Sequence, residues 1–185
     1  MNMISVIIPT GSGKINIKIL DEIKKINAEE IIIVGRNIAT DNLDNKTIIY
    51  ETNGNKNPAE NRNFGASKAN SDYLLFIDDD VLIDHNYINK KFSKDILKYD
   101  LYYGIYSTKD SNKNYTDFFE NEINRHRKLK CDLFSSSHFL IKKNIFYDLG
   151  GFNDELDTYE DIEFYNRCLN EKIKIYFDKS FEGRH

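Results

Sequence analysis

Three consecutive aspartates follow the strongest apolar run in the chain. Tyr73-Leu74-Leu75-Phe76-Ile77 continues directly into Asp78, Asp79 and Asp80. A short apolar run predicts a buried strand, and open parallel sheets bind ligands beyond the carboxyl ends of their strands. Clustered carboxylates repel one another unless a cation is near, and their oxygens suit Mg²⁺ or Mn²⁺. The alternative is a solvated loop whose acids favour the start of the next helix.

A second acidic group, Glu160-Asp161, opens a predicted helix over 160–171. A carboxylate at the start of this helix is suited to act as a general base if it faces the aspartates. Acids in the first turn of a helix are also stabilised by the helix dipole alone, so both interpretations stay open. Arg62 has three interpretations: a phosphate ligand, a partner of an aspartate, or an exposed helix arginine.

Other candidate motifs favour structural roles. The loop Thr10-Gly11-Ser12-Gly13-Lys14 is not a P-loop, because Ile15 stands where a serine or threonine is required. We expect His138 to be packed or hydrogen-bonded on a strand, and Cys168 to lie in the core.

Strand and helix signals alternate along the first half, which predicts an α/β fold with a mostly parallel central sheet flanked by helices. Asn57, Pro58 and Glu60 form a helix-start signal with a capping box. The helix over 160–171 is expected to turn its apolar residues inward; these are Ile162, Tyr165, Cys168 and Leu169. The predicted strands are 4–8, 31–34, 47–50, 73–77, 101–106, 139–141 and 173–177. The predicted helices are 15–27, 57–70, 86–99, 116–129, 144–149 and 160–171.

Composition narrows the class of protein. With 185 residues the chain is long enough for one sizeable core, so we expect a single domain over 1–185. The net charge of −4 argues against a nucleic-acid partner, since phosphate backbones are bound by clustered cations. Two cysteines are too few for a disulfide scaffold, and no apolar run reaches the ~18 residues of a membrane span. We therefore expect a cytoplasmic protein, with peripheral association with the inner face of the membrane as one option.

Taken together, these motifs resemble family 2 glycosyltransferases of the GT-A fold. The first apolar run ending Pro9-Thr10 is similar to their first strand, and 57–66 is similar to a helix ending in an Ala-Arg-Asn-x-Gly-like motif. Residues 73–80 match the strand that ends in the DxD motif, 136–152 the acceptor-side segment that ends in Gly-Gly-Phe, and 160–164 the motif beginning Glu-Asp. The nucleotide-binding half is then about 1–106 and the acceptor half about 107–185.

The resemblance implies a nucleotide-diphosphate sugar donor held by Mn²⁺ or Mg²⁺, and a glycan or lipid-linked acceptor in cell-surface polysaccharide synthesis. Asp80, with Asp78 and His185, would hold the metal ion, and Asp79 would lie near the ribose.

The same resemblance implies roles on both sides of the donor. Pro9, Thr10 and Arg62 would line the nucleotide, whereas the Glu160-Asp161 motif would supply the base. In this scheme Asp161 deprotonates an acceptor hydroxyl that attacks the anomeric carbon with inversion.

One departure from the family pattern concerns the base of the nucleotide. Relatives carry an Asp pair after the second strand, where this chain has Val34-Gly35-Arg36-Asn37. Arginine cannot accept the hydrogen bonds that aspartate accepts, so the base identity is open. Two other hypotheses remain: a sugar nucleotidyltransferase with a similar sheet, and a non-catalytic domain that binds a glycan or a partner protein.

Overall fold

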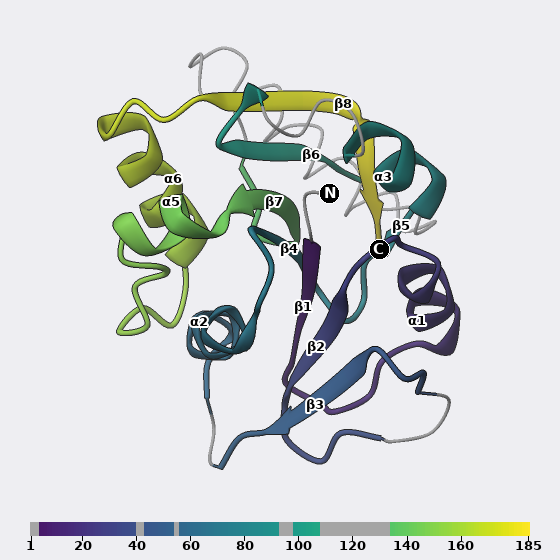
Figure 1. Ribbon diagram of the computed structural model, residues 1–185. Coiled ribbons are helices and arrows are strands. Elements are labelled where there is room, and N and C mark those ends of the chain that lie inside the picture. Colours follow the sequence, from purple (N-terminus) through teal and green to yellow (C-terminus); the bar gives the residue numbers. More distant parts are fainter. Residues whose placement is uncertain (1–3, 40–42, 54–55, 93–97, 108–133) are drawn as a thin grey trace, which may run out of the picture.

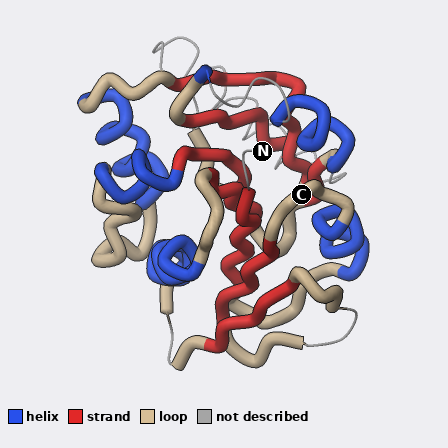
Figure 2. Tube along the Cα trace, in the orientation of Figure 1, coloured by secondary structure: helices blue, strands red, loops and turns tan. Residues whose placement is uncertain are grey.

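The computed structural model describes residues 4–39, 43–53, 56–92, 98–107 and 134–185 (Figure 1). These residues form a curved sheet with helices on both faces, as the sequence predicts (Figure 2). The strands are β1 (Ile4–Thr10), β2 (Glu30–Gly35), β3 (Thr47–Glu51), β4 (Tyr73–Ile77), β5 (Leu82–Ile83), β6 (Leu101–Ser107), β7 (His138–Lys142) and β8 (Ile175–Arg184). The helices are α1 (Ile17–Lys24), α2 (Pro58–Lys68), α3 (His85–Phe92), α5 (Lys143–Asp148) and α6 (Glu160–Asn170).

The direction of the strands changes in the middle of the sheet. The strand order is β3-β2-β1-β4-β7-β6-β8-β5, and the first four strands are parallel. β7 runs antiparallel to both β4 and β6, whereas β6 and β8 are parallel to each other. The antiparallel pairing places the start of β7 beside the end of β4, with Ile77 opposite His138. The segment that precedes β7 is thereby brought to the carboxyl edge of the parallel strands.

The sheet is buried on both faces, so its central strands read as continuous apolar runs rather than alternating ones. Every residue of β1, β2 and β4 is buried. α1 and α3 pack on one face through residues that include Ile23 and Phe92, and α2, α5 and α6 cover the other face. The second face contains a cluster of aromatic rings. In this cluster Phe76 of β4 stacks on Phe139 of β7, with 4.7 Å between the ring centroids.

α2 begins as its sequence predicts. The Asn57 side chain accepts a hydrogen bond from the Glu60 backbone N–H at 2.8 Å, and Glu60 accepts one from the Asn57 N–H at 2.9 Å. Pro58 occupies the first turn, where no backbone donor is needed. This capping box fixes where the helix starts and therefore which way its later side chains point.

Several predicted elements need correction. α3 spans His85–Phe92 of the predicted helix 86–99, of which 93–97 lie outside the described residues and 98–99 are not α-helical. The predicted helix 116–129 also lies outside the described residues. In α6 the predicted inward face is partly wrong: Ile162 and Leu169 are 46% and 51% exposed, and Phe164 is buried instead.

At the carboxyl end, β8 continues well beyond the predicted 173–177 and pairs with the short strand β5, which the sequence analysis did not predict. The register of β8 on β6 shifts beside Gly104, where a Cβ atom would lie 1.6 Å from the Phe181 carbonyl oxygen. Only glycine allows the two backbones to approach so closely. Among the described residues, none of the helices has the length and hydrophobicity that a bilayer crossing requires.

Candidate active site

The ends of β1 and β4 place Thr10 beside the aspartates. β1 and β4 are parallel neighbours with Ile7 opposite Phe76, so residues three positions further on leave the sheet at the same edge. Thr10 hydrogen-bonds to the Asp79 side chain and also accepts a bond from the Gly13 N–H at 2.9 Å. Pro9 is buried within β1, directly before Thr10. Of the residues predicted to line the nucleotide, Thr10 and Asp79 are therefore in contact.

Arg62 joins the two acidic groups. Its Nη2 atom lies 2.7 Å from the Asp78 carboxylate, and its Nη1 atom lies 3.0 Å from the Glu160 carboxylate. The Arg62 side chain is only 4% exposed. Burial disfavours its charge, but Asp78 and then Glu160 outweigh this effect, so the pKa of the guanidinium lies above its ordinary value. The predicted partnership between Arg62 and an aspartate is present, and the aspartate strand and the Glu-Asp motif meet at one place.

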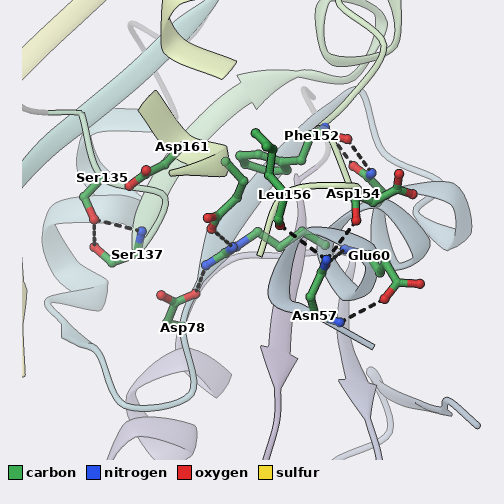
Figure 3. Close-up of polar contacts among 12 residues, drawn as sticks. Asn57, Glu60, Asp78, Ser135, Ser137, Phe152, Asp154, Leu156 and Asp161 are labelled. Carbon is green, nitrogen blue, oxygen red and sulfur yellow. Dashed lines mark hydrogen bonds and ion pairs between the residues drawn. The ribbon is translucent and has the colours of Figure 1, made fainter. Parts of the chain in front are cut away.

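The Asp161 carboxylate is held separately from that of Glu160. It accepts hydrogen bonds from the backbone N–H of Ile162 at 2.8 Å and from that of Ser136. Burial, followed by the neighbouring Glu160 charge, raises the pKa of Asp161 above its usual value. Figure 3 shows Asp161 beside the segment that carries Ser135 and Ser137. Because the Ser137 carbonyl accepts the Asp78 N–H at 2.8 Å, this segment lies between the base candidate and the aspartates.

Asp80 and His185 form the outer part of the site. The His185 Nε2 atom lies 3.1 Å from the Asp80 carboxylate, and both side chains are at least half exposed. β8 delivers His185, whose backbone N–H bonds to the Ser107 carbonyl at 3.1 Å. The Tyr106 ring stacks against His185, and burial, together with Asp80 and Asp78, raises the pKa of Tyr106 to about 12.

The side-chain oxygen and nitrogen atoms of Asp78, Asp80 and His185 suit a hard divalent cation that takes its remaining ligands from elsewhere. Among the described residues no group of three or more metal-binding side chains is preassembled. Asp80 and His185 nevertheless offer one oxygen and one nitrogen donor in contact, with the half-buried Asp78 nearby. Mg²⁺ and similar ions commonly take one or two protein carboxylates and fill the remaining positions with water and substrate phosphates. These residues fit such an ion.

The polar side chains of α2 hold the segment that leads to Glu160. Asn63 accepts the Phe152 N–H at 2.9 Å and donates to the Phe152 carbonyl at 2.8 Å. Asn57 donates to the Asp154 carbonyl at 2.8 Å, and Arg62 bonds to Glu160 (Figure 3). We call Asn57, Arg62 and Asn63 the α2 brace.

The sequence analysis missed the brace contacts of Asn57 and Asn63. The available signal was two asparagines, Asn57 at the start of the helix and Asn63 directly after Arg62, which come close to the Gly-Gly-Phe turn only after folding. The structure also explains why the second residue of that turn, Gly151, is a glycine. It has φ +71°, and a Cβ atom there would lie 2.7 Å from the Asn63 Oδ1 atom.

The sequence profile of the family described as "Glycosyltransferase like family 2" matches residues 5–179. The chain belongs to this family. The structure of the family 2 chain is similar to S. aureus TarS 1–349, with a TM-score of 0.73 and 19% identity over 98% of this chain and 60% of that one. A second structure of TarS 1–349, in complex with UDP-GlcNAc, is 20% identical over 99% of this chain and 58% of that one, with a TM-score of 0.73.

The mannosyltransferase PcManGT from Pyrobaculum calidifontis, in complex with GDP-Man and Mn²⁺, also has a TM-score of 0.73. It is 15% identical over 98% of the family 2 chain and 56% of its own. At these identities the two neighbours show a shared GT-A fold, and the present chain spans about 60% of their length. A search of curated protein sequences gave no significant match.

Proposed function

We propose that this chain is an inverting, metal-dependent glycosyltransferase. It moves a sugar from a nucleotide-diphosphate donor to a hydroxyl of a glycan or lipid-linked acceptor, in cell-surface polysaccharide synthesis. The observation that carries the proposal is the pair of ion pairs from Arg62 to Asp78 and Glu160, because they join an aspartate-rich strand end to the residue directly before the base candidate Asp161. Family membership and the nucleotide-sugar complexes of the fold neighbours support it.

Asp80, with His185 and Asp78, would hold Mn²⁺ or Mg²⁺ beside the donor diphosphate. When bound, such a cation neutralises the negative charge that the departing diphosphate gains. Thr10 and Asp79 are in contact at the same edge of the sheet, and we assign them to the nucleotide side with Pro9.

Asp161 is assigned the proton transfer. The acceptor hydroxyl oxygen forms a bond to the anomeric carbon, the bond from that carbon to the diphosphate oxygen breaks, and the hydroxyl proton passes to the Asp161 carboxylate. A raised pKa makes Asp161 a stronger base than an exposed aspartate. The backbone N–H groups of Ile162 and Ser136 fix the direction of its carboxylate. Holding donor and acceptor together lowers the entropic part of the barrier.

Ligand binding tests the donor part of this proposal. UDP or GDP, each with Mn²⁺, is expected to raise the melting temperature, and Asp80→Asn is expected to abolish the Mn²⁺-dependent part of the shift. Asp84→Asn is the matched control, because Asp84 is a nearby acid that caps the start of α3 and carries no proposed ligand role. Absence of a metal-dependent shift with both nucleotides would contradict the proposal.

Turnover tests the chemical part. UDP-GlcNAc and GDP-mannose are offered as donors, and release of UDP or GDP is measured with and without a panel of acceptors. Asp161→Asn is expected to lower kcat by about 10²–10⁴-fold while leaving nucleotide binding intact. Turnover that survives in Asp161→Asn would reassign the base. Pyrophosphate release from a nucleoside triphosphate would favour the nucleotidyltransferase hypothesis instead.

A further inference from the structure

The geometry points to Arg62 as a positioning residue that sets the spacing between the aspartate strand end and the catalytic base, and not as a ligand of the nucleotide. This inference rests on the proposed function for its kinetic consequence. Both terminal nitrogens of Arg62 are already engaged by carboxylates that lie 16 and 98 residues away in the sequence. The side chain is 4% exposed, so it presents no free face to a phosphate.

The surroundings of Arg62 fix the guanidinium in place. Its charged carbon lies 5.5 Å from the centre of the Phe152 ring, and Phe152 is itself held by both hydrogen bonds from Asn63. The planar fork of arginine can engage two separate acceptors at a fixed angle, which the single ammonium of lysine cannot do. The brace therefore links three elements: the first half of α2, the end of β4 and the start of α6.

In both acidic groups, Arg62 engages one carboxylate and leaves another one for the chemistry. Arg62 engages Glu160 and leaves the neighbouring Asp161 to backbone N–H donors, so Asp161 keeps a carboxylate that can accept a proton. In the same way Arg62 engages Asp78, whereas Asp80 is more than half exposed and, among the ion pairs of the described residues, pairs with His185. One buried cation thus offsets part of the charge of Asp78 and Glu160, while the Asp80 and Asp161 carboxylates stay outside its ion pairs.

The test compares Arg62→Met, Arg62→Lys and the double variant Arg62→Met with Glu160→Gln. Arg167→Met is the control, because Arg167 also pairs with a glutamate of α6, at 2.6 Å, but its other contacts are the Leu149 carbonyl and the Phe164 ring rather than an aspartate. A displaced base is expected to lower kcat about 100-fold in Arg62→Met, whereas the Kd of UDP or GDP with Mn²⁺ stays within about threefold. Arg62→Lys is expected to recover part of kcat, and Arg167→Met is expected to keep it.

The double variant separates positioning from stability. Glu160→Gln removes one of the two carboxylate charges that Arg62→Met leaves unpaired, so the melting temperature is expected to recover in part while kcat remains low. Recovery of kcat along with the melting temperature would overturn the inference, since the ion pair would then serve folding alone. An increase of about tenfold or more in nucleotide Kd with kcat unchanged would also overturn it, because that pattern marks a lost diphosphate contact.

A structural readout keeps the inference testable if the proposed function fails. A wild-type chain with no turnover and no metal-dependent nucleotide binding would refute the glycosyltransferase proposal. Hydrogen exchange at the amides of 160–163 then decides about Arg62 by itself. Faster exchange at these amides in Arg62→Met than in Arg167→Met supports the positioning role, and equal exchange in the two variants refutes it.

Discussion

The two sides of the site are held in place by different kinds of interaction. Thr10 ends β1 and Asp78–Asp80 follow β4, and the backbone pairing and complete burial of these two strands determine where they end. The segment 151–161 has no sheet partner among the described residues and depends on the α2 brace. The first side is therefore supported by sheet pairing and apolar packing, and the second by the single buried ring of Phe152 together with a few polar side chains. The difference implies that mutations should separate stability from catalytic alignment.

Phe76→Ala should give the largest effect and tests the apolar side. Phe76 is fully buried in β4 and packs against Phe139, Phe146 and Phe152. Removing a ring of this kind from a core destabilises a protein by about 3–5 kcal/mol. Urea unfolding measures the change, with Ile48→Ala on the half-exposed edge strand as the control. A loss of less than about 1 kcal/mol would break the comparison.

His138, at the start of β7 where the two sides meet, should give the next largest effect. Burial lowers the pKa of His138 to about 4, and the ring contacts the Phe181 carbonyl at 3.2 Å. The unfolded chain binds a proton near pH 6.5 and the folded chain does not, so stability is lost as the pH falls from about 6.5 towards 4. At and below about pH 4, His138 lowers the free energy of unfolding by about 3 kcal/mol relative to neutral pH. The free energy of unfolding, measured at several pH values, should fall less towards acid pH in His138→Gln than in the wild type. An equal fall in the two proteins would refute the role of His138.

Gly151→Ala tests the brace. The added methyl group meets the Asn63 Oδ1 atom and is strained at φ +71°. We expect destabilisation of about 1–3 kcal/mol, because an alanine with positive φ is strained and the two bonds to Phe152 are disturbed. kcat per folded molecule is expected to fall as well, because the displaced segment carries the base candidate. Gly11→Ala is the control, since its Cβ atom would have no neighbour within 4 Å. Equal effects of the two substitutions would show that the brace is dispensable.

Asp79→Asn should give the smallest change in stability. Unlike the other substitutions, it should raise the free energy of unfolding. Burial raises the pKa of Asp79, the Thr10 hydroxyl opposes this, and the Asp80 charge adds to it. A raised pKa means that the ionised side chain destabilises the folded state at neutral pH. Removing the charge should therefore stabilise the ligand-free chain, by at most about 1 kcal/mol because solvent screens a half-exposed group. Thermal unfolding at pH 7 measures it, and a clear decrease in melting temperature would contradict the expected sign.

The apolar side could be predicted from the sequence because its signals are local. The buried runs of β1, β2 and β4 need no knowledge of distant residues, and the Asn57–Glu60 capping box is complete within four positions. The end of the aspartate strand and the Glu-Asp motif, whose proximity the sequence left open, also meet through Arg62. The roles of the individual acids in binding and catalysis remain predictions.

The elements that were mispredicted depend on distant partners. Ile162 and Leu169 carry the apolar periodicity of α6, yet the aromatic cluster around Phe152 takes Phe164 instead. The polar stretch Asp178-Lys179-Ser180 has the composition of a loop, but it lies within β8 because β6 pairs with both sides of it. The two-residue strand β5 is too short to give a periodic signal and forms only against the end of β8.

The contact between Gly151 and Asn63 has an evolutionary consequence. Any larger residue at 151 collides with Asn63, whereas a smaller residue at 63 leaves the Phe152 backbone without its two partners. A single substitution at either position is therefore destabilising, so a lineage can change this arrangement only through a less stable intermediate. Descendants of a common ancestor should consequently keep both residues or have exchanged both.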